Sequence, residues 1–252
     1  MRRWLPNLML DLVKRVLHDG NERRDGEYAP TMIGSRGAYP ASRAAALSGV
    51  PLSTVHDWAR KDVLVPSISP ERVKLWSYAD LMGLRIIQWL RRDKVVEDGR
   101  VPRTTMSAVK RALVQLAELD LALWTEDVGP SVVVDRSGNV LVRTEPHHEA
   151  DARQRVLDDE LDVLSPFVSA DGLRGPDLLI PRPRLRIVPG KLGGSPHVVH
   201  TRLESRALGA LADSGLTSAK IYRLYPDVER PAIDEALDLE QQLARNLRPV
   251  AA

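Results

Sequence analysis

The sequence predicts a mainly α protein with four segments. They are an N-terminal extension (residues 1–38), a winged helix-turn-helix domain (39–103), a connector of one helix and a β-hairpin (104–180), and a C-terminal three-helix domain of helix-turn-helix type (181–252). Three observations predict this class. Two stretches place a glycine between short helical patterns, a longer run repeats apolar residues at helical spacing, and two β-branched runs flank a turn in mid-chain.

Composition narrows the class of protein. The 252 residues suffice for two small domains, and the absence of cysteine excludes disulfides and thiolate chemistry. No apolar run approaches the roughly 20 residues that span a bilayer. Residues 1–20 begin with basic residues, but charges interrupt their apolar pattern and no cleavage site follows, so they make a poor signal peptide. We expect a cytoplasmic protein and assign no role to the extension.

The first two predicted helices lie close together. Ser42 is a good N-cap for the first helix, and Gly49 lies where that helix must end. Ser53 can cap a second helix that runs to Lys61. Because Val55 is three residues from Trp58 in that second helix, the two form a buried edge and leave the other faces polar. A short polar helix on an apolar support has the geometry needed to enter a major groove.

A wing and a third helix are predicted next. Residues 63–65 and 73–76 suggest two strands around a turn at 66–72, and the third helix begins at residue 77. Basic residues of the wing are available to phosphates. The residues expected to contact DNA are Ser53, Thr54, His56, Arg60, Lys61, Arg72 and Lys74.

Two parts of this segment, AAALSGVPLSTVHDWARKDVLVPS and SYADLMGLRIIQWL, resemble the DNA-binding domain of the MerR-type winged helix-turn-helix family. The resemblance implies binding to double-stranded operator DNA and a role in transcription regulation. Lys and Arg outnumber Asp and Glu in residues 39–103 and 181–252 but not in 104–180, a distribution that fits DNA contact at one or both ends.

The connector has its own predicted structure. Helical spacing extends over residues 104–124, and a second, acidic helix is expected at 150–163. Between them, β-branched runs at 131–135 and 139–143 flank Arg136-Ser137-Gly138 and predict a hairpin. A lone hairpin is marginal in water, so it must pack within its own chain or pair with a second copy in a homodimer. The sequence leaves both arrangements open.

The C-terminal segment begins with extended structure at residues 181–189 and continues with three helices. The first helix ends at Ser214-Gly215, Thr217 caps the second, and Pro231 opens the third. This spacing again indicates a helix-turn-helix-like unit. Its expected exposed surface consists of Arg202, Ser218, Lys220 and Arg223.

Residues 186–240 resemble a small domain family of unnamed function that is associated with VapB-type antitoxins. The matching elements include Gly194-x-Pro196, Thr201-Arg202 and Tyr225-Pro226, whereas His200 stands where the pattern usually has glycine. The resemblance implies a type II antitoxin that neutralises a PIN-domain (VapC-like) ribonuclease by direct binding and represses its own operon. The alternative is a stand-alone MerR-like transcriptional regulator without a toxin partner.

Arginines are candidates for contact with such a ribonuclease, because its clustered carboxylates favour cationic groups in an inhibitor. For the run at 182–186, surface charge on a linker is the favoured interpretation over direct insertion into the nuclease. The candidate residues are Arg182, Arg184, Arg186, Arg245 and Arg248.

The sequence contains no strong motif that is typical of an enzyme active site. His147-His148-Glu149 and the pair His197 and His200 lack a recognised metal-site spacing such as H-E-x-x-H. No glycine-rich loop leads from a strand into a helix, and no nucleophile elbow is visible. We therefore expect no enzyme activity, no metal and no cofactor.

Overall fold

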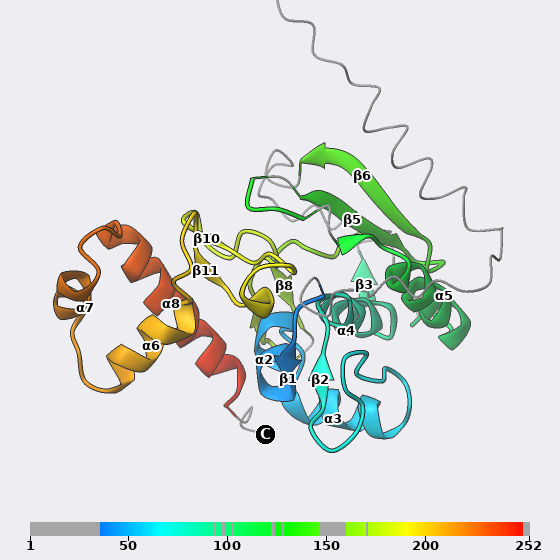
Figure 1. Ribbon diagram of the computed structural model, residues 1–252. Coiled ribbons are helices and arrows are strands. Elements are labelled where there is room, and N and C mark those ends of the chain that lie inside the picture. Colours follow the sequence, from blue (N-terminus) through cyan, green and yellow to red (C-terminus); the bar gives the residue numbers. More distant parts are fainter. Residues whose placement is uncertain are drawn as a thin grey trace, which may run out of the picture. The chain divides into compact units, whose positions relative to one another are not determined.

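The structure is a computed structural model, and it describes residues 36–92, 94–96, 99–101, 103–121, 124–127, 129–146, 160–169 and 171–248 (Figure 1). Nearly all of the predicted extension and the whole His147-His148-Glu149 cluster lie outside these residues. Within them the fold is helix-rich and mixed α/β, with seven α-helices and several short antiparallel strands. None of the described helices is both long and apolar enough to cross a membrane.

Helices α2 (Ala41–Ser48) and α3 (Leu52–Arg60) are joined by a three-residue turn. Gly49 ends α2 as predicted, with a left-handed φ of 74° and its N–H donated to the Ala45 carbonyl. The predicted N-caps are wrong, because the helices begin earlier: Pro40 and Pro51 occupy the cap positions, and no side chain caps either helix.

The predicted wing differs from the observed one. Residues 63–65 form no strand, because the backbone N–H of Val63 donates to the Trp58 carbonyl and holds the chain at the end of α3. Strand β2 (Leu75–Trp76) pairs instead with β1 (Tyr39–Pro40). A turn is present but lies later than the predicted 66–72, since the backbones of Ser69 and Leu75 exchange two hydrogen bonds of 3.1 and 2.9 Å and close the loop between them.

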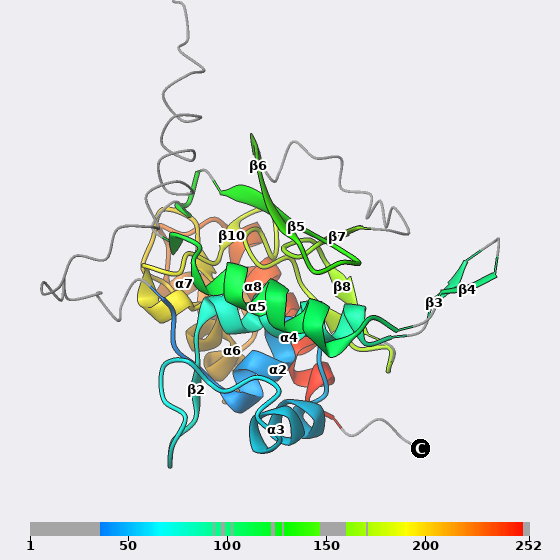
Figure 2. The same ribbon diagram turned by 90° about the vertical axis from the view of Figure 1, so that its right-hand side faces the viewer.

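The third predicted helix is α4 (Tyr78–Leu90), and it begins with a complete capping box. The Ser77 hydroxyl accepts from the Asp80 backbone N–H, and the Asp80 carboxylate accepts from that of Ser77. A short hairpin of β3 (Lys94–Val96) and β4 (Gly99–Val101), which the sequence did not predict, leads to α5 (Met106–Ala117). Figure 2 shows α5 in front of α4.

The predicted connector hairpin is confirmed as β5 (Pro130–Asp135) and β6 (Val140–Pro146). It packs within its own chain, because the Gln115 side chain of α5 accepts a 2.6 Å hydrogen bond from the Val140 backbone N–H. The helix predicted at 150–163 is wrong at its end: β7 (Glu160–Asp162) adds to the free edge of β5 and gives the sheet order β6-β5-β7. This pairing buries Leu161 and satisfies backbone groups that an edge strand would expose.

Short antiparallel pairs connect this sheet to the C-terminal helices. Strand β8 (Phe167–Val168) pairs with β9 (Arg174–Gly175), and β10 (Leu185–Arg186) pairs with β11 (His197–Val198). Residues 181–189 are therefore not a free linker, since Leu185 and Ile187 are fully buried. A short 3-10 helix, η3 (Leu192–Gly194), lies between β10 and β11.

Three helices complete the chain: α6 (Ser205–Asp213), α7 (Ser218–Leu224) and α8 (Arg230–Asn246). Thr217 caps α7 with its side chain, as predicted. His200 adopts a φ of 58°, the left-handed conformation that favours glycine, which gives a physical reason for the usual glycine at this position.

Contacts between distant segments form one continuous core. The Tyr78 hydroxyl donates a 2.7 Å hydrogen bond to the Leu178 carbonyl, and the Asn246 side-chain amide donates one of 2.9 Å to the Ala46 carbonyl. The buried apolar cluster extends from Tyr39 to Leu243. Helices α2 and α8 are therefore packed against each other although almost the whole chain separates them.

Candidate nucleic-acid interface

Helix α3 presents polar side chains on a buried support. Val55 is fully buried and Ala59 nearly so, which fixes the helix against the core. The exposed side chains on the other faces are those of Ser53, His56, Arg60 and Lys61, while Thr54 is half-buried. These residues, all predicted from the sequence, therefore lie on one short helix and, for Lys61, at the cap position directly after it.

Exposed ion pairs connect the cations of α3 to Asp57. Its carboxylate pairs with Arg60 and, at 2.8 Å, with Lys61. The hydrogen bond from Lys61 is the main cause that lowers the pKa of Asp57, and Arg60 adds to it. Both basic side chains are mostly exposed, so these pairs contribute little to stability and can exchange for contacts with phosphates.

The loop closed by Ser69 and Leu75 carries the other predicted contacts. Arg72 is exposed and Lys74 half-buried. The residue preceding this loop is fixed to α4, because both the backbone N–H and the hydroxyl of Ser67 donate to the Asp80 carboxylate, at 2.9 and 2.8 Å. Burial raises the pKa of Asp80. The chain leading into this loop is thus anchored to α4.

The surface predicted in the C-terminal segment contains exposed cations, a polar side chain with a partner, and apolar side chains. Lys220 and Arg223 are exposed on α7, and Arg202 is exposed in the turn before α6. Ser218 donates a hydrogen bond to the Asp234 carboxylate of α8, so this side chain stabilises the helix packing. Two apolar side chains, Tyr222 and Leu224, are also exposed on α7.

Three of the arginines predicted to contact a ribonuclease have partners within the chain. Arg182 pairs with Asp238 at 2.7 Å, and Arg184 pairs with Glu235 at 2.8 Å, both on α8. The Nε of Arg186 donates to the backbone carbonyl of Glu126 at 2.9 Å. These residues therefore fix the segment before β11 to its surroundings.

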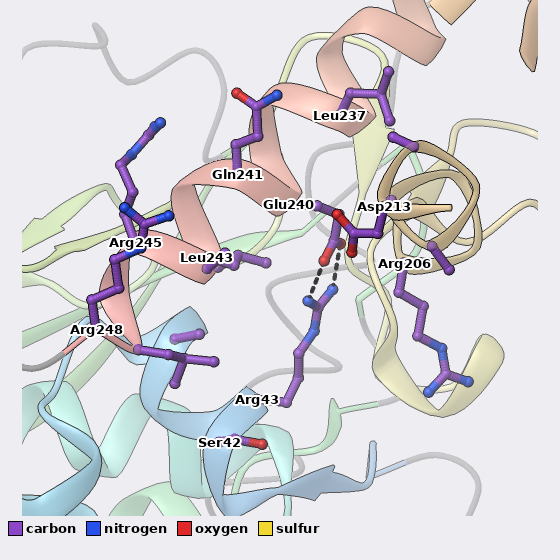
Figure 3. Close-up of a pocket in the computed structure, with 16 residues that line it drawn as sticks. Ser42, Arg43, Arg206, Asp213, Leu237, Glu240, Gln241, Leu243, Arg245 and Arg248 are labelled. Carbon is purple, nitrogen blue, oxygen red and sulfur yellow. Dashed lines mark hydrogen bonds and ion pairs between the residues drawn. The ribbon is translucent and has the colours of Figure 1, made fainter. Parts of the chain in front are cut away.

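The other two arginines line a groove of about 670 Å³ between α2, α6 and α8 (Figure 3). Arg245 and Arg248 are exposed there, and neither forms an ion pair with any residue that the structure describes. The sequence reasoning did not find the groove. Its lining residues come from three helices that are not adjacent in the sequence, so their spacing within any one helix does not indicate it.

His197 and His200 both lie close to the carboxylate of Glu126. The Nε2 of buried His197 lies 2.8 Å from Glu126, His200 lies 3.3 Å from it, and the Lys191 ammonium is 2.6 Å away. Partial burial opposes ionisation of this carboxylate, but hydrogen bonds from Lys191 and His197 lower the pKa of Glu126 to about 2. In the part of the chain that the structure describes, no group of His, Asp and Glu is arranged to hold a metal ion.

Comparison with known proteins gives one result. A family model described as a protein of unknown function (DUF433) matches residues 186–239, which include β11, α6 and α7 and most of α8. This is the segment in which the sequence predicted a small domain family of unnamed function. No curated protein and no solved structure matches the chain. The MerR-type and VapB-type resemblances therefore remain predictions.

Proposed function

We propose that this protein is a DNA-binding antitoxin of a type II toxin-antitoxin system. It binds and neutralises a PIN-domain ribonuclease and, as a homodimer in the cytoplasm, represses its own operon. The observation that carries the proposal is helix α3, whose polar face is exposed and whose buried edge is fixed by α2 and the core.

The DNA-binding part of the proposal follows from the spacing on α3. Ser53, His56 and Arg60 lie at positions i, i+3 and i+7, so they share one face of a nine-residue helix. A helix of this kind can lie in the major groove and read base edges. Arg72 and Lys74, in the loop that follows, are suited to phosphate contacts that position the helix.

The antitoxin part has two supports. The match at 186–239 coincides with the segment that resembles the antitoxin-associated family. In addition, Arg245 and Arg248 are exposed cations without an ion-pair partner among the described residues. A ribonuclease with clustered carboxylates offers the complementary charge.

Titration of operator fragments with variants tests the DNA-binding part. We expect Arg60→Ala to weaken binding by about 1–3 kcal/mol and to relax sequence preference. Lys74→Ala should weaken binding to every sequence alike and reduce the salt slope by about one. Lys110→Ala, an exposed change on α5, is the control and should bind normally. Unchanged affinity in both test variants would show that α3 and the loop do not contact DNA.

Co-expression with the PIN-domain ribonuclease encoded by a neighbouring gene tests the antitoxin part. We expect a stable complex that does not cleave RNA. Undiminished nuclease activity in the mixture would remove this part of the proposal.

The second candidate, a stand-alone MerR-like transcriptional regulator, would bind DNA through the same helix and loop. DNA binding alone therefore does not separate the two functions. Operator binding without any complex with a ribonuclease, or the absence of a nuclease gene beside this one, would favour the stand-alone regulator.

A further inference from the structure

The groove between α2, α6 and α8 has a floor of small residues. Gly209 and Ala210 of α6, Ala46 of α2 and Ala244 of α8 line it. A Cβ atom at Gly209 would lie 3.0 Å from the Cγ of Glu240, so glycine at this position lets α6 approach the Glu240 side chain of α8 closely. Small side chains thus leave room for side chains of another molecule.

The groove is long enough for a helix. Leu237 and Arg245, which both line it, are eight residues apart on α8, and this corresponds to about 12 Å or two helical turns. Leu243 is almost fully buried beneath this stretch, and the accessible apolar side chains of the groove are those of Leu237 and, just past Arg245, Leu247. An amphipathic helix could place its apolar face against them, as in other helix-in-groove complexes.

The charges in the groove are not balanced. Arg43 and Glu240 neutralise each other through two hydrogen bonds of 2.7 and 2.8 Å, and both are largely buried. Arg206 pairs with Glu204. Three charged side chains that line the groove therefore have no ion-pair partner among the described residues. They are Asp213 of α6, Arg245 of α8 and Arg248, which follows α8.

We propose that this groove binds an acidic amphipathic helix of the partner ribonuclease. The inference rests on the proposed function and names the surface that it uses. Acidic residues of the occupant pair with Arg245 and Arg248, and its apolar residues cover the alanine and glycine floor. Nucleic acid is disfavoured here, because the alanine and glycine floor carries no side-chain hydrogen-bond donors for phosphates.

The groove lies next to the helix that supports α3. Ser42 and Ala46 line the groove from α2, and α2 packs against α3. A bound helix would therefore contact the element that supports α3. The loop at 69–75 and α3 itself do not line the groove and stay available to DNA.

Two groups of substitutions test the groove. Ala244→Trp fills it, and the double change Arg245→Glu with Arg248→Glu reverses its free charge. All three residues are exposed, so the fold should persist, and thermal unfolding checks this. Matched controls on α7 are Ala219→Trp and Arg223→Glu, which also alter exposed residues but lie outside the groove.

The measurements are the Kd for the neighbouring PIN-domain ribonuclease and the inhibition of its RNA cleavage. We expect each groove variant to raise Kd by at least about tenfold and the α7 variants to bind normally. Normal binding by the groove variants, or loss of binding in the α7 variants alone, would overturn the groove assignment while leaving the antitoxin function intact. If the unaltered protein formed no complex, both proposals would be overturned together.

Discussion

Gly49 and Gly215 lie just after helices in two parts of the chain, Gly49 as the cap of α2 and Gly215 one position after the cap of α6. Each follows a serine, adopts a left-handed φ (74° and 93°) and precedes an apolar residue. Six residues after each glycine stands a fully buried β-branched residue, Val55 or Ile221. We call α2 and α3 the N-terminal helix pair and α6 and α7 the C-terminal helix pair.

The two pairs differ in what surrounds them. Helix α2 buries five of its eight residues, whereas α6 buries only Ser205 and Leu208 of nine. Within the N-terminal helix pair, α2 is enclosed by α4, β9 and α8, while the C-terminal helix pair rests mainly on α8. The same turn chemistry thus forms a helix pair twice, and neighbouring segments decide whether it is rigidly embedded or peripheral.

Arg85 links the end of α2 to segments that follow much later in the chain. The side chain is fully buried in α4, and its guanidinium donates to backbone carbonyls at the end of α2 and in two later segments. Burial lowers the pKa of Arg85 to about 10, so the group stays cationic at neutral pH. The carbonyls belong to Leu47, Ser48, Val163, Leu164, Ser165 and Pro176.

The largest predicted effect is that of Arg85→Leu. It leaves several buried carbonyls without a donor, each of which costs about 1–3 kcal/mol, so we expect a loss of roughly 3 kcal/mol or more in the free energy of unfolding. Urea unfolding measures it. Arg91→Leu is the control, because this partly exposed side chain donates only to the Thr104 carbonyl among the described contacts. Equal losses in the two variants would show that Arg85 does not hold the N-terminal helix pair.

Substituting the two glycines compares the pairs directly. Alanine in the left-handed conformation costs about 1–2 kcal/mol, which is the whole effect expected for Gly215→Ala, where a Cβ meets nothing within 4 Å. At Gly49 a Cβ would lie 2.5 Å from the Gly175 backbone nitrogen, and overpacking adds about 1–3 kcal/mol. Denaturant midpoints of the two variants give both values. A smaller loss at Gly49 than at Gly215 would contradict the embedding of the N-terminal helix pair.

Local signals in the sequence predicted much of the fold. Gly49, Gly215 and Thr217 have their predicted roles because each acts through its own backbone or that of near neighbours. The signals at Ser42 and Ser53 failed, since a proline just before each helix had already set the extended backbone of the cap position. The hairpin at 131–143 was found because its turn and its strands are adjacent in sequence.

Long-range pairings were not predictable in this way. The partner of β2 is β1, about 35 residues earlier, and neither strand of two residues carries a pattern of its own. The groove combines faces of three helices, so no single stretch indicates it. Arg85 had a local signal, one charge inside the apolar run LMGLRIIQWL, but its carbonyl partners are visible only in the fold.

The smallest predicted effect concerns the attachment of the C-terminal helix pair. Glu126 fixes the segment before α6 through Lys191 and His197, so Glu126→Gln should lower the free energy of unfolding by about 1 kcal/mol at neutral pH.

The contribution of Glu126 to the free energy of unfolding depends on pH. The folded pKa of Glu126, about 2, lies below the unfolded value near 4.3, so its contribution is complete above the unfolded value and disappears as pH falls toward 2. We therefore expect the stability difference between the unaltered protein and Glu126→Gln to shrink as the pH falls from about 5 to about 2, because this range includes both pKa values. Glu118→Gln, an exposed change at the end of α5, should show no such trend. A difference that stayed constant with pH would mean that the ionised carboxylate does not stabilise this attachment, and the C-terminal helix pair would then be held mainly by its contacts with α8.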